Sequence, residues 1–183
     1  MEWLDVVDEN GIPTGETVSR ERAHAEGIPH RTSHVWLVRK RDGRLQILLQ
    51  KRSEEKDSFP GCYDISSAGH IPAGENYVPS ALRELEEELG VVCAPEDLVF
   101  CGQRQFHFER VFHGKLFRDR QVTKVYLLWE DRDEDRFSIQ EEEISAVKWF
   151  DFDACLQAVR ENTMPHCIYE EELLMVQEAA DTP

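Results

Sequence analysis

The sequence lacks long apolar runs, paired cysteines and an excess of positive charge, and each absence narrows what the chain does. No stretch approaches the roughly 18 consecutive apolar residues of a membrane span. With 21 Lys and Arg against 37 Asp and Glu, the formal net charge is −16. Nonspecific attraction to nucleic acid or to an anionic membrane is therefore not expected, and an anionic substrate would need local positive charge to bind.

Cysteine is too scattered for a disulfide framework. The cysteines are Cys62, Cys93, Cys101, Cys155 and Cys167. They are odd in number and include no C-x-x-C pair, so neither a set of disulfides nor a zinc knuckle is indicated. We expect reduced thiols, mostly in the core, and a cytoplasmic protein.

The rest of the composition predicts one globular domain. Apolar residues make up 40% of the 183 residues, which is enough for a hydrophobic core at the length of an ordinary domain. No internal repeat, low-complexity tract or linker divides the chain. We therefore predict a single domain over residues 1–183, with no nucleic-acid or membrane partner.

Alternation of apolar and polar residues predicts three β-hairpins. Their turns are Glu9-Asn10-Gly11, Arg41-Asp42-Gly43 and His113-Gly114. Further expected elements are strands over 34–38, 45–50, 65–68, 98–109, 115–130 and 144–150, a short helix or connector over 19–30, a helix over 77–89, and two C-terminal helices. Because these elements do not form a regular βαβ series, the sequence predicts an α/β fold with a mixed central sheet, helices on its faces and an N-terminal hairpin.

The helix over 77–89 carries a cluster of glutamates. At about 100° per residue, Glu84, Glu87 and Glu88 fall on one face, beside the apolar stripe of Leu85 and Leu89. Like charges four residues apart destabilise an isolated helix, so a positive partner is expected there. Three converging carboxylates make an oxygen-only site that suits Mg²⁺, or alternatively Mn²⁺, and not zinc. The alternative interpretation is a solvated acidic face.

The loop before this helix is built to turn tightly. Gly69, Pro72 and Gly74 precede the helix, and glycine lets the backbone come close to a ligand or a metal. A backbone carbonyl at or next to Gly69 would complete the shell of the expected cation. The pattern Gly-x-x-Pro-x-Gly alone is also typical of an ordinary turn.

Loop and helix together form a motif with fixed spacing. Gly69, five residues, Glu75, seven residues and then Arg83-Glu84-Leu85-Glu86-Glu87-Glu88-Leu89-Gly90-Val91 match every fixed position of the Nudix box, G-x5-E-x7-R-E-U-x-E-E-x-G-U, where U is apolar. The chain thus resembles the Nudix hydrolases. Nine specified positions make chance agreement very improbable.

The resemblance implies a role for each residue of the motif. Glu84, Glu87 and Glu88 correspond to metal-binding glutamates, and Arg83 to the residue that orients them. Gly69 corresponds to a backbone metal ligand. The family fold, an α/β/α sandwich with a mixed sheet, agrees with the order of elements expected above.

Similarity outside the box extends to the isomerase-like branch of Nudix proteins, which includes type 1 isopentenyl-diphosphate isomerase. The N-terminal segment, His24, His30 and the stretch around Arg52 carry it. The chain departs from that enzyme at Ala68, where the isomerase has its proton-transferring cysteine. It departs also at Asp119 and Gln121, which replace two glutamates that help the isomerase histidines bind a second metal, so that site is expected to be degraded.

These observations predict a Mg²⁺-dependent hydrolase that cleaves a diphosphate linkage in a nucleoside diphosphate derivative or a related organic diphosphate. Arg52, Lys56 and His70 are the expected substrate-binding residues. The general base would come from the box helix, from Glu84 or Glu87, or from a downstream acidic loop, where we favour Glu143 because it immediately precedes the strand over 144–150.

Other interpretations remain. A solvated loop is the alternative for Glu143, and we expect His34 to be structural. An isopentenyl-diphosphate isomerase-like enzyme without the cysteine and a non-catalytic nucleotide-binding Nudix sensor are alternatives for the whole chain. A homodimer is an open alternative to a monomer.

Overall fold

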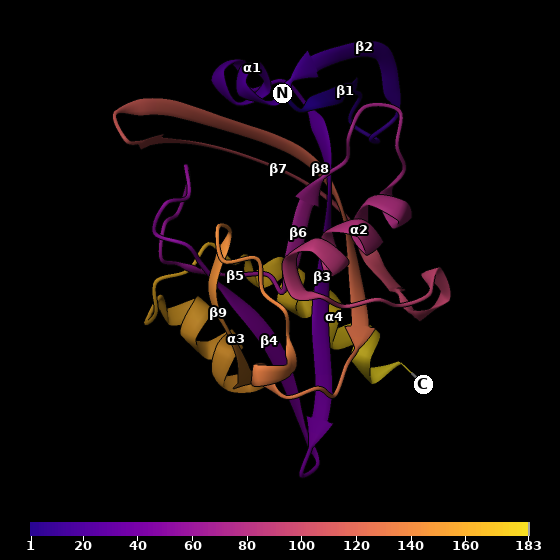
Figure 1. Cartoon of the computed structure of the whole chain (residues 1–183), viewed down its shortest axis with the longest axis vertical. Coiled ribbons are helices and arrows are strands. Elements are labelled where there is room, and N and C mark those ends of the chain that lie inside the picture. The colour runs from indigo at the N-terminus through magenta and orange to yellow at the C-terminus, as the bar shows by residue number, and fades with distance from the viewer. Residues whose placement is uncertain (183) are drawn as a thin grey trace.

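The central element of the fold is a mixed β-sheet, whose strands come from most of the length of the chain (Figure 1). The computed structural model describes residues 1–182. The strands are β1 (Trp3–Val7), β2 (Pro13–Ser19), β3 (His30–Arg41), β4 (Arg44–Arg52), β5 (Tyr63–Asp64), β6 (Ser67–His70), β7 (Val99–Phe112), β8 (Lys115–Trp129) and β9 (Ile144–Asp151). The helices are α1 (Arg20–Glu26), α2 (Tyr77–Leu89), α3 (Phe152–Glu161) and α4 (Glu170–Asp181), with two short 3₁₀ helices over Pro95–Asp97 and Glu134–Arg136.

The long strand β3 organises the sheet. One edge of β3 pairs in parallel with β8, which continues antiparallel to β7. The other edge is shared: its first half pairs with β6 and its second half with β4. Beyond β3, β4 pairs with β9 and β5 rather than with β6. The sheet therefore divides between β6 and β4, and the predicted mixed sheet is confirmed.

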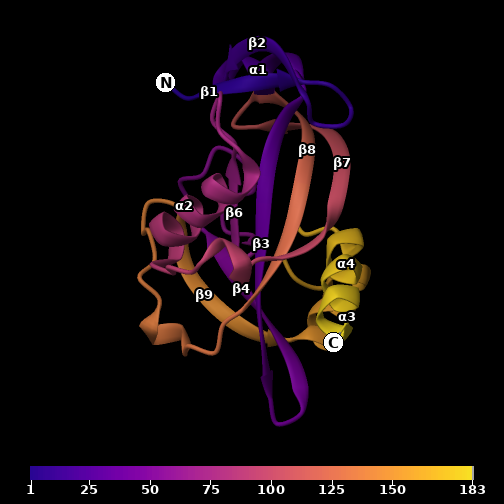
Figure 2. The same ribbon diagram turned by 90° about the vertical axis from the view of Figure 1, so that its right-hand side faces the viewer.

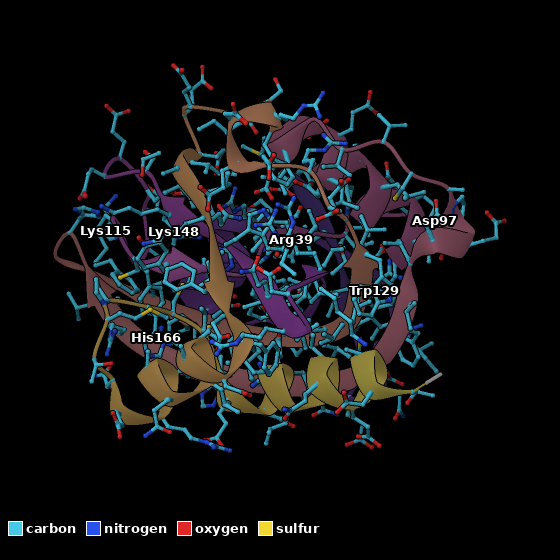
Figure 3. The ribbon with its side chains drawn as sticks, turned by 90° about the horizontal axis from the view of Figure 1, so that it is seen from below. Arg39, Asp97, Lys115, Trp129, Lys148 and His166 are labelled. Carbon is cyan, nitrogen blue, oxygen red and sulfur yellow. The ribbon has the colours of Figure 1, made fainter. Side chains whose placement is uncertain are left out.

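Helices cover both faces of this sheet. Helix α2 lies on one face, while α3 and α4 lie on the other, as the side view and the view from below show (Figures 2 and 3). Each face has its own buried core: Leu85, Leu89 and Val35 belong to the core under α2, and Trp36 and Leu173 to the core under α3 and α4. The predicted α/β/α sandwich is thus confirmed.

The N-terminal hairpin β1–β2 and helix α1 cap one end of the molecule, beside the β7–β8 hairpin (Figure 1). They enclose a small core of Leu4, Val18 and Ala23. Gly27 ends α1 in the left-handed conformation, at a φ of 71°, where a side chain would be strained. The N-terminal hairpin predicted from sequence is confirmed.

The helix that carries the glutamates has the predicted bounds. It runs over Tyr77–Leu89, and Gly90 ends it with a φ of 65° and a backbone N–H donated to the carbonyl of Glu86. Ala81, Leu85 and Leu89 are fully buried against the sheet, as the apolar stripe predicted. The strands of the central hairpin are longer than predicted, because polar residues continue the pairing beyond the apolar segments.

The five cysteines are free, as predicted, but they are not mostly in the core. Only Cys155 is buried, and the other four are partly exposed. Among residues 1–182, no helix has the length and apolar character needed to cross a membrane.

Truncating the buried stripe of α2 tests how this helix is attached. Leu85 is fully buried, so Leu85→Ala should lower the free energy of unfolding by about 2–5 kcal/mol through lost burial and a cavity. Glu86 is exposed on the same helix, and Glu86→Ala should change that free energy by no more than about 0.5 kcal/mol. Chemical denaturation measures both, and equal losses in the two variants would contradict this packing.

Candidate functional site

A cavity of about 300 Å³ lies where the sheet divides, between α2, β6 and the segment that follows β4. The β7–β8 hairpin, α1 and the residues before α4 complete its walls. Of the residues predicted from sequence, those that line it are Arg52, Lys56, Gly69, His70, Glu84, Glu87, Glu88 and Glu143. Residues far apart in the sequence thus meet in one place.

Arg83 connects two of the box glutamates. Its guanidinium lies 2.9 Å from Oε1 of Glu84 and 3.2 Å from Oε2 of Glu87. Such a fork holds both carboxylates in fixed orientations, which is the arrangement expected of the residue that orients them. The Glu87 side chain is half exposed, at 52%, whereas that of Glu84 is 18% exposed.

The carboxyl groups of Glu84 and Glu88 are largely shielded from water. Burial raises the pKa of Glu88 to about 8, although Ser67 and the backbone N–H of Ala68, which donates to Oε2 at 3.2 Å, act in the opposite direction. Burial raises the pKa of Glu84 to about 7, against the lowering effect of Arg83. Carboxyl groups held this way favour either a proton or a cation, so these oxygens fit a hard divalent ion.

Gly69 lets Glu84 approach the backbone of β6. A Cβ atom added at Gly69 would lie 2.4 Å from Cδ and Cγ of Glu84 and 2.7 Å from its Oε1. A side chain at this position would have to displace the Glu84 side chain from its place. The glycine therefore places a backbone segment directly beside the carboxylate, as a metal site built from both would require.

The two cationic residues predicted to bind substrate already have partners. Arg52 donates to Oδ2 of Asp64 at 2.9 Å and to the carbonyl oxygen of Ser58 at 2.8 Å, which holds the loop after β4. The ammonium of Lys56 pairs with the carboxylate of Glu143. Glu143 thus lies at the cavity, where the sequence prediction placed it, but in an ion pair.

A second group of polar atoms converges at the end of β6, and two of its residues, His24 and His70, line the same cavity. His24 from α1, His30 from β3 and His70 from β6 each bring a ring nitrogen within 4.8 Å of the others. Nε2 of all three rings is buried and has no hydrogen-bond partner within residues 1–182. Nδ1 of His30 lies 2.9 Å from the carbonyl oxygen of Ile28. The Nδ1 proton is therefore donated to that oxygen, and the Nε2 lone pair stays free.

Asp119 of β8 extends this group. Its Oδ1 lies 3.5 Å from Nε2 of His30 and 3.7 Å from Nε2 of His24, and it too lacks a hydrogen-bond partner. Burial raises the pKa of Asp119 to about 6 and lowers those of His24 and His30 to about 3 and about 4. The imidazoles are therefore neutral near pH 7, as metal ligands must be.

The four buried atoms of this group that lack partners within residues 1–182 are Nε2 of His24, His30 and His70 and Oδ1 of Asp119. Each would lower the stability of the fold by about 1–3 kcal/mol if nothing bound to it. Imidazole nitrogens with one carboxylate oxygen suit a transition-metal ion such as Zn²⁺. The substitutions at 119 and 121 predicted a degraded second site, yet His24, His30 and His70 still converge, and Asp119 lies within 3.7 Å of two of them. The amide of Gln121 does not join them, because it donates to Oδ2 of Asp119 at 2.7 Å.

Sequence reasoning missed several residues of the cavity. Asp64, which holds Arg52, lies in the two-residue strand β5, which is too short to show a periodic pattern in the sequence. His34, predicted to be structural, lines the cavity and pairs with Glu172 of α4. These residues are 138 positions apart, and nothing local in the sequence signals their contact.

Comparison with known proteins decides the family. A family model described as the NUDIX domain matches residues 29–171. The chain belongs to the Nudix family. Its relatives include Nudix hydrolase 3 of Arabidopsis thaliana, 41% identical over 156 residues, which are 83% of this chain and 19% of that protein. An uncharacterised Nudix hydrolase of Clostridium acetobutylicum is 32% identical over 83% of this chain and 71% of its own length.

The chain therefore spans about a fifth of the length of its Arabidopsis relative. With the Nudix domain and these relatives, the chain is a Nudix hydrolase.

Solved structures support the fold. A Deinococcus radiodurans protein superposes with a TM-score of 0.67 at 21% identity, covering 97% of this chain and 99% of its own. The Nudix domain of NrtR from Shewanella oneidensis, solved with ADP-ribose, gives 0.56 at 22% identity, with 82% and 86% covered. At such identities the likeness shows a shared Nudix fold.

The raised pKa values of Glu84 and Glu88 predict that Mg²⁺ binds more weakly in acid. Lowering the pH from about 8.5 to 6 protonates both carboxyl groups in the metal-free protein, and the ion must displace those protons. The dissociation constant for Mg²⁺, measured by calorimetry, should rise at least about tenfold over this range. Glu86→Gln, on the exposed side of α2, should leave the profile unchanged. A flat profile in the unaltered protein would contradict the assignment.

The histidine group predicts a separate transition-metal ion. The protein should retain one tightly bound Zn²⁺ per chain after dialysis, and His30→Ala should lose it because one ligand is removed. His107 is exposed and outside the cavity, so His107→Ala should retain the ion. Elemental analysis measures the content, and equal zinc in the His30→Ala protein would place the ion elsewhere.

Proposed function

We propose that this Nudix hydrolase cleaves a diphosphate linkage in a nucleoside diphosphate derivative or a related organic diphosphate, with Mg²⁺ at Glu84, Glu87 and Glu88. The observation that carries the proposal is the position of Glu84, paired with Arg83 and set against Gly69, at the edge of a cavity of about 300 Å³ that Glu87 and Glu88 also line. Mn²⁺ is the alternative ion, since it accepts the same oxygen ligands.

The bound cation would neutralise the diphosphate and lower the pKa of an attacking water. The chain's own residues do the rest. Arg83 keeps Glu84 and Glu87 in place, Gly69 admits the close approach of Glu84, and His70 faces the cavity from the end of β6.

Lys56 and Glu143 act together in this proposal. In the protein alone they form an ion pair at the cavity. A diphosphate is a stronger attractant for an ammonium than one carboxylate, because it carries more negative charge. Lys56 would turn to the substrate, and Glu143 would then be free to take a proton from the attacking water. Arg52 is held by Asp64 and Ser58. Its positive charge would attract the same phosphates electrostatically.

The substrate's organic group would occupy the aromatic part of the cavity. Phe106, Phe108 and Phe117 line it together with Tyr169, and such rings stack on bases or pack against apolar groups. The related NrtR domain was solved with ADP-ribose, a nucleoside diphosphate derivative, which supports this substrate class.

Neither alternative function is favoured. Isomerisation would need a proton-transferring group where Ala68 has only a methyl, and the relatives named above are hydrolases. A sensor without catalysis would not need the complete set of box glutamates. The isomerase-like branch, the homodimer and the cytoplasmic location stay predictions from sequence. That residues 1–183 act as one domain is proposed because α1 supplies His24 to the cavity.

Glu87 and its neighbour Glu86 give a matched test. Both are exposed residues of α2, but only Glu87 contacts Arg83 and lines the cavity. Glu87→Gln should lower the rate of substrate hydrolysis by about 10- to 100-fold without loss of stability, whereas Glu86→Gln should retain full activity. A screen with Mg²⁺ over nucleotide sugars, dinucleotides, nucleoside triphosphates and prenyl diphosphates, with the products separated by chromatography, identifies the substrate. Unchanged hydrolysis by the Glu87→Gln protein would overturn the proposal.

A further inference from the structure

One buried pair at the cavity has no part in the diphosphate chemistry described above. His34 lies in the middle of β3, and Glu172 lies in the first turn of α4 on the same face of the sheet. Nδ1 of His34 is 2.8 Å and 3.0 Å from the two carboxylate oxygens of Glu172. The contact joins a residue at the floor of the cavity to a helix behind it.

Glu172 is fixed as an anion in this position. Burial raises its pKa, but His34 and Arg104 outweigh burial and lower it to about 2. Arg104 donates to Oε1 at 2.9 Å, and the indole N–H of Trp36 donates to Oε2 at 3.0 Å. An ionised carboxylate only accepts hydrogen bonds, so Nδ1 of His34 must carry the proton that lies between the two residues.

The other ring nitrogen of His34 therefore faces the cavity. His34 lines the cavity, and Nε2 is not among the buried atoms of residues 1–182 that lack a partner. No protein group within that range bonds to it either, so it is accessible from the cavity. In the neutral imidazole this atom is a hydrogen-bond acceptor.

Two neighbours of His34 on the floor of the cavity offer the substrate no free hydrogen-bonding group. Ala68, directly opposite on β6, offers only a methyl group. The hydroxyl of Thr32 is already bonded to Gln121 at 3.0 Å and to Thr123 at 2.6 Å. The wall above consists of aromatic rings, with Phe106 and Tyr169 5.2 Å apart between centroids.

We propose that His34, held by Glu172, is a specificity-determining residue that hydrogen-bonds a hydroxyl of the substrate's organic group. A hydroxyl both donates and accepts, so it matches Nε2 whether the imidazole is neutral or protonated. A hydrocarbon chain would leave Nε2 without a partner inside the cavity, which is unfavourable. The inference rests on the proposed function and narrows it to hydroxyl-bearing diphosphates, such as sugar or nucleoside derivatives, over pure hydrocarbon ones.

A pair of substrates of equal size isolates this contact. An ω-hydroxypentyl diphosphate and hexyl diphosphate differ by a hydroxyl in place of a methyl. With the full-length protein and Mg²⁺, kcat/KM for phosphate release should be about 10- to 100-fold higher for the hydroxyl compound, the range that one or two good hydrogen bonds confer.

Variants at His34 test the residue itself. His34→Leu should reduce the ratio of the two kcat/KM values to near one, chiefly by lowering the value for the hydroxyl compound. Glu172 keeps Arg104 and Trp36 as partners in that variant, so we expect the fold to be retained. Phosphate release from hexyl diphosphate checks that the variant is folded. His34→Gln, whose amide reaches a similar position, should keep part of the preference. His107→Leu, an exposed residue outside the cavity, should keep all of it.

The outcomes separate this inference from the proposed function. A ratio near one in the unaltered protein, or a preference that survives in His34→Leu, overturns the role of His34 while diphosphate hydrolysis stands. No hydrolysis of either compound, together with no hydrolysis of the nucleotide and sugar diphosphates, overturns both.

Discussion

Two carboxyl groups of α2 are held where water reaches them poorly, and the cavity is organised around their charge. Glu84 rests against the backbone at Gly69, and Glu88 lies among the apolar residues that attach the helix to the sheet. Burying acidic groups in this way costs free energy unless a proton or a cation is bound. Arg83 compensates for only part of the charge. A leucine at position 88 would pack at less cost, so the stability of the fold alone does not explain the glutamate.

The positively charged side chains at the cavity are also held by groups of opposite charge. Although the chain is strongly acidic, Arg52 and Lys56 both line the cavity, and both are paired with carboxylates, Asp64 and Glu143. These pairs hold the loop after β4 in place before any substrate arrives. In the proposed function, a phosphate group would replace Glu143 as the partner of Lys56. Preorganisation of this kind lowers the cost of ordering charged side chains on binding.

How much of this was readable from the sequence depends on distance along the chain. The bounds of α2, its buried stripe and the glutamate face are local properties, set by a period of 3.6 residues, and they could be predicted closely. The hairpins were predictable for the same reason. The contacts of His30 with Asp119 and of His34 with Glu172 span 89 and 138 positions. They depend on how β8 and α4 dock against β3, which no local pattern specifies.

The match to the Nudix family covers residues 29–171, yet the cavity does not stop at those limits. His24 enters it from α1, and Glu172, just past the other limit, holds His34 from α4. In the proposed function, the shared domain would supply the hydrolytic face, while α1 and α4 would help to shape the pocket for the organic group. Exchanging these two flanks between homologues would then change which metabolite is accepted and leave the phosphate chemistry of the parent enzyme in the chimera.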